Sequence, residues 1–274
     1  MNWRLIIDGR AGPARNMAVD EAVSISVRKK LSPPSLRLYT WSGPAVTIGY
    51  FQQIKREVNV ERCRQNNIDV VRRITGGRAV VHGRQELTYS FSSPFQSPFS
   101  SLNLHETYKL LSKAFIAGFN RLGIAAEISS VRSSGRPGIN AGRNPVCFQS
   151  LSFAEAAVDG RKIIGSAQKR WSSGLMQQGS IPLELNHDHI YSLLSFRSET
   201  ARKRAMAAAG EKMAGLRDFV PGLSSDELAA AVQYGFKSTF GVNFRKERLS
   251  LEEERIAGAL EVKRYGSETW NLKR

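Results

Sequence analysis

The chain has 274 residues, of which 41% are hydrophobic and 9% aromatic, a composition that suits a globular protein with a sizeable core. It contains no run of about 18 uncharged apolar residues, so we expect no membrane span, and its first residues are charged too early for a signal peptide. The net charge of +16 and the pI of about 10.2 favour acidic partners, which include acidic protein domains and nucleic acid.

The first third of the chain alternates short strands with two helices. Ser32-Pro33-Pro34 ends the first of these helices, because proline cannot continue a helix. We predict helices at residues 16–30 and 59–67. We predict strands at residues 3–8, 36–41, 45–49 and 68–73.

A glycine bend follows the fourth strand, and basic residues surround it. Two adjacent glycines allow positive φ and let the backbone approach a ligand closely. A bend of this kind, with unpaired N–H groups, is suited to an electron-rich ligand. His82 closes the segment, and a histidine there can equally be a structural hydrogen-bonding group. The whole segment reads Arg72-Arg73-Ile74-Thr75-Gly76-Gly77-Arg78-Ala79-Val80-Val81-His82.

The rest of the chain indicates an α+β protein. Residues 104–122 form the clearest helix, which Gly123 ends, and residues 129–144 form a loop rich in Ser, Gly, Arg and Pro. Asp159-Gly160 predicts a hairpin turn. Further strands are expected at 86–91, 153–158, 161–170 and 175–185, and helices at 225–240 and 250–265. We therefore predict one domain, residues 1–274, with a mixed, largely antiparallel sheet, flanking helices and a helical C-terminal segment from about 187 to 274.

Two cysteines and one lysine are the candidates for covalent chemistry. Cys147 follows the predicted loop and could act as a nucleophile if a cation such as Lys162 raised its thiolate fraction. A lone cysteine is more often a small buried hydrophobe, and we interpret Cys63 in that way. With no disulfide framework, the chain is expected in the reducing cytoplasm. The small residues Gly165-Ser166-Ala167 would allow a ligand to approach the strand after Lys162.

Taken together, these motifs resemble those of the lipoate–biotin protein ligase superfamily. The pairing of Cys147 with Lys162, and Gly76-Gly77-Arg78 in place of three glycines, resembles the octanoyl-carrier-protein:protein N-octanoyltransferases of lipoate assembly. The resemblance runs from about residue 17 to residue 271. It rests on the segments Arg72 to His82, Glu86-Leu87-Thr88-Tyr89-Ser90, Cys147-Phe148, Asp159 to Gln168 and Gln178-Gly179-Ser180-Ile181.

The resemblance implies the fold of class II tRNA synthetase and biotin ligase catalytic domains, with no cofactor and no metal. It implies that Cys147 takes octanoyl from octanoyl-acyl carrier protein as a thioester. A lysine on a lipoyl-domain protein, such as the glycine-cleavage H protein or a dehydrogenase E2 subunit, would then receive it. Lys162 would lower the pKa of Cys147 and orient the carbonyl. The implied substrate-binding residues are Arg73, Gly76, Gly77, Arg78, His82, Gly165, Ser166 and Ala167.

The sequence departs from the family pattern at Gly83, where relatives often carry Asp, and at Gln178, where they often carry His. An ATP-dependent lipoate ligase would instead use the arginines and glycines to hold an acyl-adenylate, and an amidotransferase would take its acyl group from another lipoylated protein. A nucleic-acid-binding protein would interleave basic and aromatic residues on one element, whereas the aromatics here occupy core positions. We expect no nucleic-acid or membrane partner, and a monomer.

Overall fold

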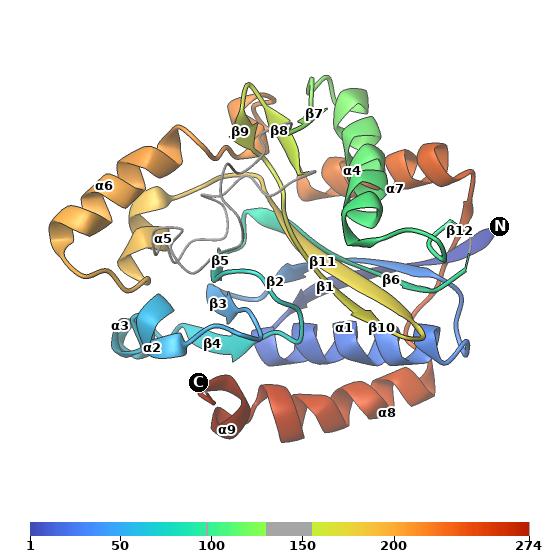
Figure 1. Cartoon of the computed structure of the whole chain (residues 1–274), viewed down its shortest axis with the longest axis horizontal. Coiled ribbons are helices and arrows are strands. Elements are labelled where there is room, and N and C mark those ends of the chain that lie inside the picture. The colour runs from blue at the N-terminus through green and yellow to red at the C-terminus, as the bar shows by residue number, and fades with distance from the viewer. Residues whose placement is uncertain (97, 130–154, 274) are drawn as a thin grey trace.

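The computed structural model describes residues 1–96, 98–129 and 155–273. A six-stranded sheet forms its centre, in the order β10-β11-β6-β2-β1-β12 (Figure 1). β1 runs parallel to β2 and β12, and the remaining neighbours are antiparallel. The strands are β1 Asn2–Ala11, β2 Ser35–Trp41, β6 Glu86–Pro94, β10 Gly165–Trp171, β11 Gly174–Pro182 and β12 Asn243–Lys246.

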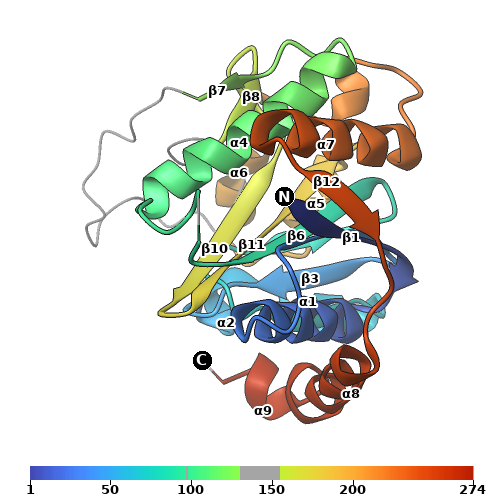
Figure 2. The same cartoon turned by 90° about the vertical axis from the view of Figure 1, so that its right-hand side faces the viewer.

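Helices cover both faces of this sheet, as Figure 2 shows. α1 (Pro13–Arg28) and α8 (Leu251–Leu260) lie on one face, and α4 (Leu104–Arg121) and α7 (Ser225–Phe240) on the other. The absence of a side chain at Gly235 lets α7 pack closely against α4. A Cβ at this position would lie 2.0 Å from the carbonyl oxygen of Ala114. The aromatic rings of Trp3 and Phe91 pack between the sheet and these two helices. The main hydrophobic core therefore lies on the α4–α7 side.

Two small sheets flank the central one and carry the motifs of interest. One has the order β4-β3-β5 and the other β7-β8-β9. Their strands are β3 Ala45–Ile48, β4 Asp69–Arg72, β5 Val80–His82, β7 Glu127–Ile128, β8 Ala156–Val158 and β9 Arg161–Lys162. The remaining helices are α2 Ile54–Glu57, α3 Val60–Gln65, α5 His187–Ser192, α6 Glu199–Gly210 and α9 Glu268–Asn271, with a 3₁₀ turn at Leu216–Asp218 and a π-helical turn at Glu261–Tyr265.

The structure confirms the predicted α+β class and the mixed sheet, but it corrects two elements. The predicted strand 161–170 is two strands, because the chain leaves the hairpin after Lys162 and β10 joins the central sheet beside β11. The segment predicted to be helical contains β12, which pairs with β1 through registers such as Asn2 with Asn243. β12 is mostly exposed and has no apolar alternation, so only its tertiary pairing makes it a strand.

In the part of the chain that the structure describes, the longest helices are too polar to cross a bilayer.

Candidate active site

The glycine bend between β4 and β5 has one glycine that its backbone requires. Gly77 has φ +86°, in the left-handed region, whereas Gly76 is not among the residues with positive φ. The bend packs against Gly49, where a Cβ would lie 2.0 Å from the carbonyl oxygen of Gly77. The prediction of positive φ is thus confirmed at Gly77 but not at Gly76. The bend approaches Gly49 of the protein itself, and its predicted close approach to a ligand stays a prediction.

Arg73 holds the bend from inside the protein. One guanidinium nitrogen donates to the Thr47 carbonyl (2.9 Å) and hydroxyl (2.8 Å) oxygens. The other nitrogen donates to the carbonyl oxygens of Gly76 (2.9 Å) and Arg78 (3.0 Å). The Arg73 side chain is buried, so much of its hydrogen-bonding capacity fixes the shape of the bend.

His82 sits in a fixed hydrogen-bond network. Its Nδ1 lies 2.7 Å from Glu86 Oε1 and its Nε2 lies 2.7 Å from Thr47 Oγ1, while its ring stacks on Trp41. Glu86 also accepts from Trp41 Nε1 and from the Thr88 hydroxyl. Burial raises the pKa of Glu86, but His82 and these donors outweigh burial and hold it below its ordinary value. Both ring nitrogens of His82 therefore have partners within the fold.

An apolar cavity lies between the bend and the β10–β11 strand pair. Arg73 and His82 line it from one side, and Gly165, Ser166 and Ala167 line it from the other. Met17, Trp41 and Val80 supply apolar walls. The fold thus brings five of the predicted binding residues to one cavity, namely Arg73, His82, Gly165, Ser166 and Ala167. Gly76, Gly77 and Arg78 do not line this cavity, and their predicted contact with an acyl chain stays a prediction.

Gln178 connects the cavity floor to the bend. Its side-chain nitrogen donates to Asp20 of α1 (3.0 Å), and its oxygen accepts from the Thr75 hydroxyl (2.9 Å). Asp20 also accepts from Arg37 and from the Tyr39 hydroxyl. Burial raises the pKa of Asp20, although Arg37 opposes this shift. The glutamine at this departure from the family pattern therefore joins α1, β11 and the bend.

Lys162 is fully buried and forms an ion pair that the sequence did not reveal. Its Nζ lies 2.5 Å from Glu155 Oε2, and the two side chains are 0% and 2% exposed. The predicted hairpin positions the lysine, since Asp159 and Gly160 have φ values of +49° and +73° and Lys162 pairs with Ala157. A buried ammonium group requires such a partner.

Tyr89 connects this ion pair to the cavity. Its hydroxyl lies 2.7 Å from Ser166 Oγ and accepts from Gln177 (2.9 Å). Burial raises the pKa of Tyr89 well above its usual range, and the negative charge of Glu155 adds to the shift. Glu155 therefore lies close enough to Tyr89 for its charge to act on the hydroxyl that contacts Ser166.

The two cysteines differ in what the structure says of them. Cys147 lies outside the described residues, so its predicted approach to Lys162 stays a prediction. Cys63 is buried in α3, where burial raises its pKa to about 11. That thiol is protonated at neutral pH, which supports its interpretation as a structural residue.

The fold is that of the lipoate-attaching enzymes. A bipartite lipoate protein ligase from Thermoplasma acidophilum aligns over 99% of this chain and 96% of its own, with a TM-score of 0.82 and 25% identity. A lipoate-protein ligase A bound with ATP gives a TM-score of 0.82 at 24% identity, over 99% of each chain. These structures confirm the predicted type of fold.

The sequence comparisons identify the family. The lipoyl protein ligase A/B catalytic domain model matches residues 12–237. A relative named octanoyltransferase LipM from an Exiguobacterium species is 38% identical over 274 residues, covering 99% of this chain and 98% of its own. The relative of that name from Bacillus subtilis is 36% identical over the same shares. The chain therefore belongs to the lipoyl protein ligase A/B catalytic domain family.

Proposed function

We propose that this chain is an octanoyltransferase of lipoate assembly that works through an acyl-enzyme on Cys147. The names of the near full-length relatives support octanoyl transfer as predicted. The observations that carry the proposal for the site are the apolar cavity lined by Arg73, His82 and Ser166, and the fully buried Lys162–Glu155 ion pair. The apolar lining suits an unbranched alkyl chain, because its burial needs no hydrogen-bond partners. The cavity has a volume of about 30 Å³, so its walls must move apart to admit eight carbons.

The proposed reaction has two steps at the same thioester energy level. The Cys147 thiolate attacks the octanoyl carbonyl, its sulfur forms a bond to the acyl carbon, and the carrier's phosphopantetheine thiolate leaves and takes a proton. A neutral lysine amine of the lipoyl domain then attacks the acyl-enzyme. An amide forms, the amine loses a proton, and Cys147 leaves as thiolate. No ATP is consumed, because the thioester is already activated.

Lys162 would supply the positive charge that this sequence of steps needs. A charge in a low-dielectric interior acts more strongly than one in water, so a buried ammonium can stabilise a nearby thiolate and a developing oxyanion. Glu155 would fix the position of that ammonium group. The net charge of +16 suits the acidic carrier protein and the acidic lipoyl domains of H protein and E2 subunits. We propose that the enzyme acts as a cytoplasmic monomer.

Intact-mass measurement tests the proposal. The enzyme is mixed with octanoyl-acyl carrier protein without ATP, and one octanoyl group should add to the wild type and to Cys63→Ala but not to Cys147→Ala. An adduct that Cys147→Ala retains would refute the assignment of the nucleophile. Acylation that requires ATP would favour a ligase instead.

A further inference from the structure

A second and larger cavity adjoins the apolar one. It has a volume of about 710 Å³ and is lined by the chain from β5 to the start of β6, by α5 and by Met213. Val80, His82 and Ser180 line both cavities, so the two meet at the ends of β5 and β11. We call them the inner cavity, at Ser166, and the outer cavity, at α5.

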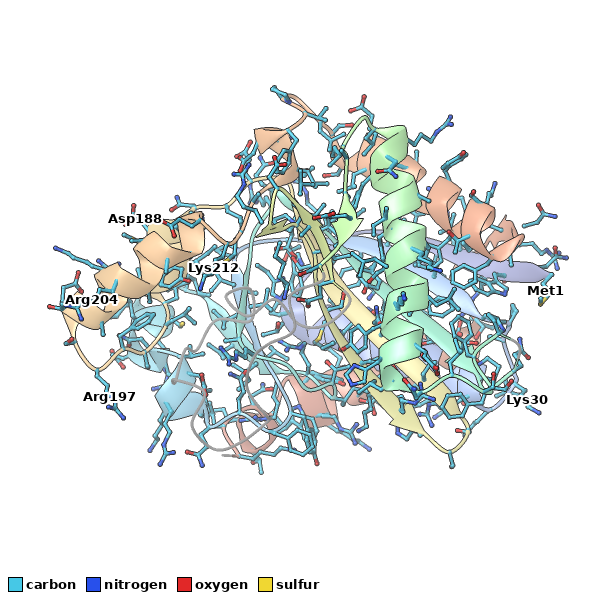
Figure 3. The ribbon with its side chains drawn as sticks, turned by 45° about the horizontal axis from the view of Figure 1, so that its top comes forward. Met1, Lys30, Asp188, Arg197, Arg204 and Lys212 are labelled. Carbon is cyan, nitrogen blue, oxygen red and sulfur yellow. The ribbon has the colours of Figure 1, made fainter. Side chains whose placement is uncertain are left out.

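The wall of the outer cavity is joined directly to the backbone of Lys162. The Lys162 N–H donates to the Lys212 carbonyl (2.8 Å), and the Ala214 N–H donates to the Lys162 carbonyl (3.1 Å). Met213, between them, is a wall residue. In Figure 3, Lys212 and the wall residue Asp188 lie at the same end of the molecule, beside α6. An acyl chain that enters the inner cavity with its carbonyl at the junction would extend the group that carries its sulfur into the outer cavity.

The lining of the outer cavity combines apolar, uncharged polar and charged side chains, the last including Glu184, Asp188 and Arg84. Leu185 and Ile190 contribute hydrocarbon, and His187 contributes an imidazole. Burial lowers the pKa of His187, so its ring is neutral at pH 7 and offers one donor and one acceptor. Its Nδ1 is buried and has no hydrogen-bond partner in the described part of the chain. Arg84 lines the cavity and is exposed to solvent.

We propose that the outer cavity binds the phosphopantetheine arm of the octanoyl donor, with the thioester at the junction of the two cavities. The arm carries a dimethyl group, amides and a hydroxyl, which match this mixed lining, and its phosphate would lie toward Arg84. The inference rests on the proposed function, because it assumes a thioester donor.

The test compares two donors on the same enzyme. Octanoyl-pantetheine carries the arm, and octanoyl-N-acetylcysteamine carries only its last few atoms. Leu185→Trp, which narrows the outer cavity, should lower the ratio of acylation rates between these donors at least about tenfold, or 1.4 kcal/mol. Leu251→Trp makes the same change on exposed α8 and should leave the ratio unaltered. The ratio is independent of the fraction of enzyme that folds. An unchanged ratio in Leu185→Trp would overturn the inference.

Competition gives a second measurement. Free pantetheine should inhibit acylation by octanoyl-N-acetylcysteamine in the wild type, and Leu185→Trp should weaken that inhibition. Inhibition by ATP but not by pantetheine would assign the cavity to a nucleotide and overturn the inference. If octanoyl-acyl carrier protein also failed to acylate Cys147, the proposed function would fail together with the inference. If Cys147 were acylated but the donor ratio were the same in Leu185→Trp as in the wild type, the inference would fail and the proposed function would stand.

Discussion

The ion pair between Lys162 and Glu155 gives the sharpest prediction. Glu155→Gln keeps the size of the side chain but leaves a buried ammonium 2.5 Å from a neutral amide. Removing one partner of a buried pair costs about 3–5 kcal/mol. The exposed pair Glu184–Arg217 has the same separation, 2.5 Å, with Glu184 54% exposed. Breaking a pair of that kind costs about 0–1 kcal/mol. Glu184→Gln is therefore the matched control.

Urea unfolding measures the difference between the two variants. With an m-value of about 3 kcal/mol per molar urea, Glu155→Gln should lower the midpoint by about 1–2 M and Glu184→Gln by about 0.3 M or less. The double variant Glu155→Leu with Lys162→Met should recover most of the stability, since an apolar pair can replace a buried ion pair. It should remain inactive. Equal midpoint shifts in the two Gln variants would refute the argument that burial makes the Lys162–Glu155 pair essential.

Four further predictions follow from the site and the charge. Lys162→Ala should raise the pH at which Cys147 reacts with iodoacetamide and should slow acylation; an unshifted alkylation profile would refute its role. The Glu86 pKa is held below its ordinary 4.5, so the stability that it contributes is present above that pH and is lost as the pH falls below it. Glu86→Gln should remove that part of the acid sensitivity in pH-dependent unfolding. Gly77→Ala should lower the free energy of unfolding by about 1–2 kcal/mol, because residue 77 has a φ of +86°. Gly76→Ala has open space for a Cβ and should lower the free energy of unfolding by less, as urea unfolding of both variants would show. Finally, salt should weaken the reaction with an acidic carrier protein far more than that with octanoyl-N-acetylcysteamine, which steady-state rates between 0.05 and about 0.5 M NaCl would show.

Local signals in the sequence were enough for several elements. Asp159-Gly160 predicted its hairpin because few residues accept two successive positive φ values, and both occur. The apolar spacing along Leu104–Arg121 predicted α4 within about one residue. β12 was missed because its residues are mostly exposed, and only pairing with β1 makes it a strand. The break after Lys162 was missed because Ile163 and Ile164 are β-branched and buried, as residues within a strand often are.

The site shows the same division between local and tertiary information. Arg73, His82 and Ser166 were predicted from their motifs, and they line one cavity. Glu155 was missed, although a lone carboxylate in the run Ala154-Glu155-Ala156-Ala157 was a usable signal, because an apolar strand tolerates it only with a buried partner.

The partners of His82 were not predictable in the same way. Thr47, Glu86 and Trp41 belong to three different strands. Their meeting depends on strand pairing, which no single motif encodes. The sequence therefore predicts which residue types surround a ligand better than it predicts which groups hold them in place.

Transfer from an isolated acyl-enzyme tests the central claim most directly. Octanoyl-enzyme, freed from carrier protein and ATP, is mixed with a lipoyl domain, and the masses of both proteins are followed in time. We predict that the octanoyl mass leaves Cys147 and appears on one lysine of the lipoyl domain at a rate matching steady-state turnover. An acyl-enzyme that persists, or that transfers its acyl group only when ATP is added, would contradict the account.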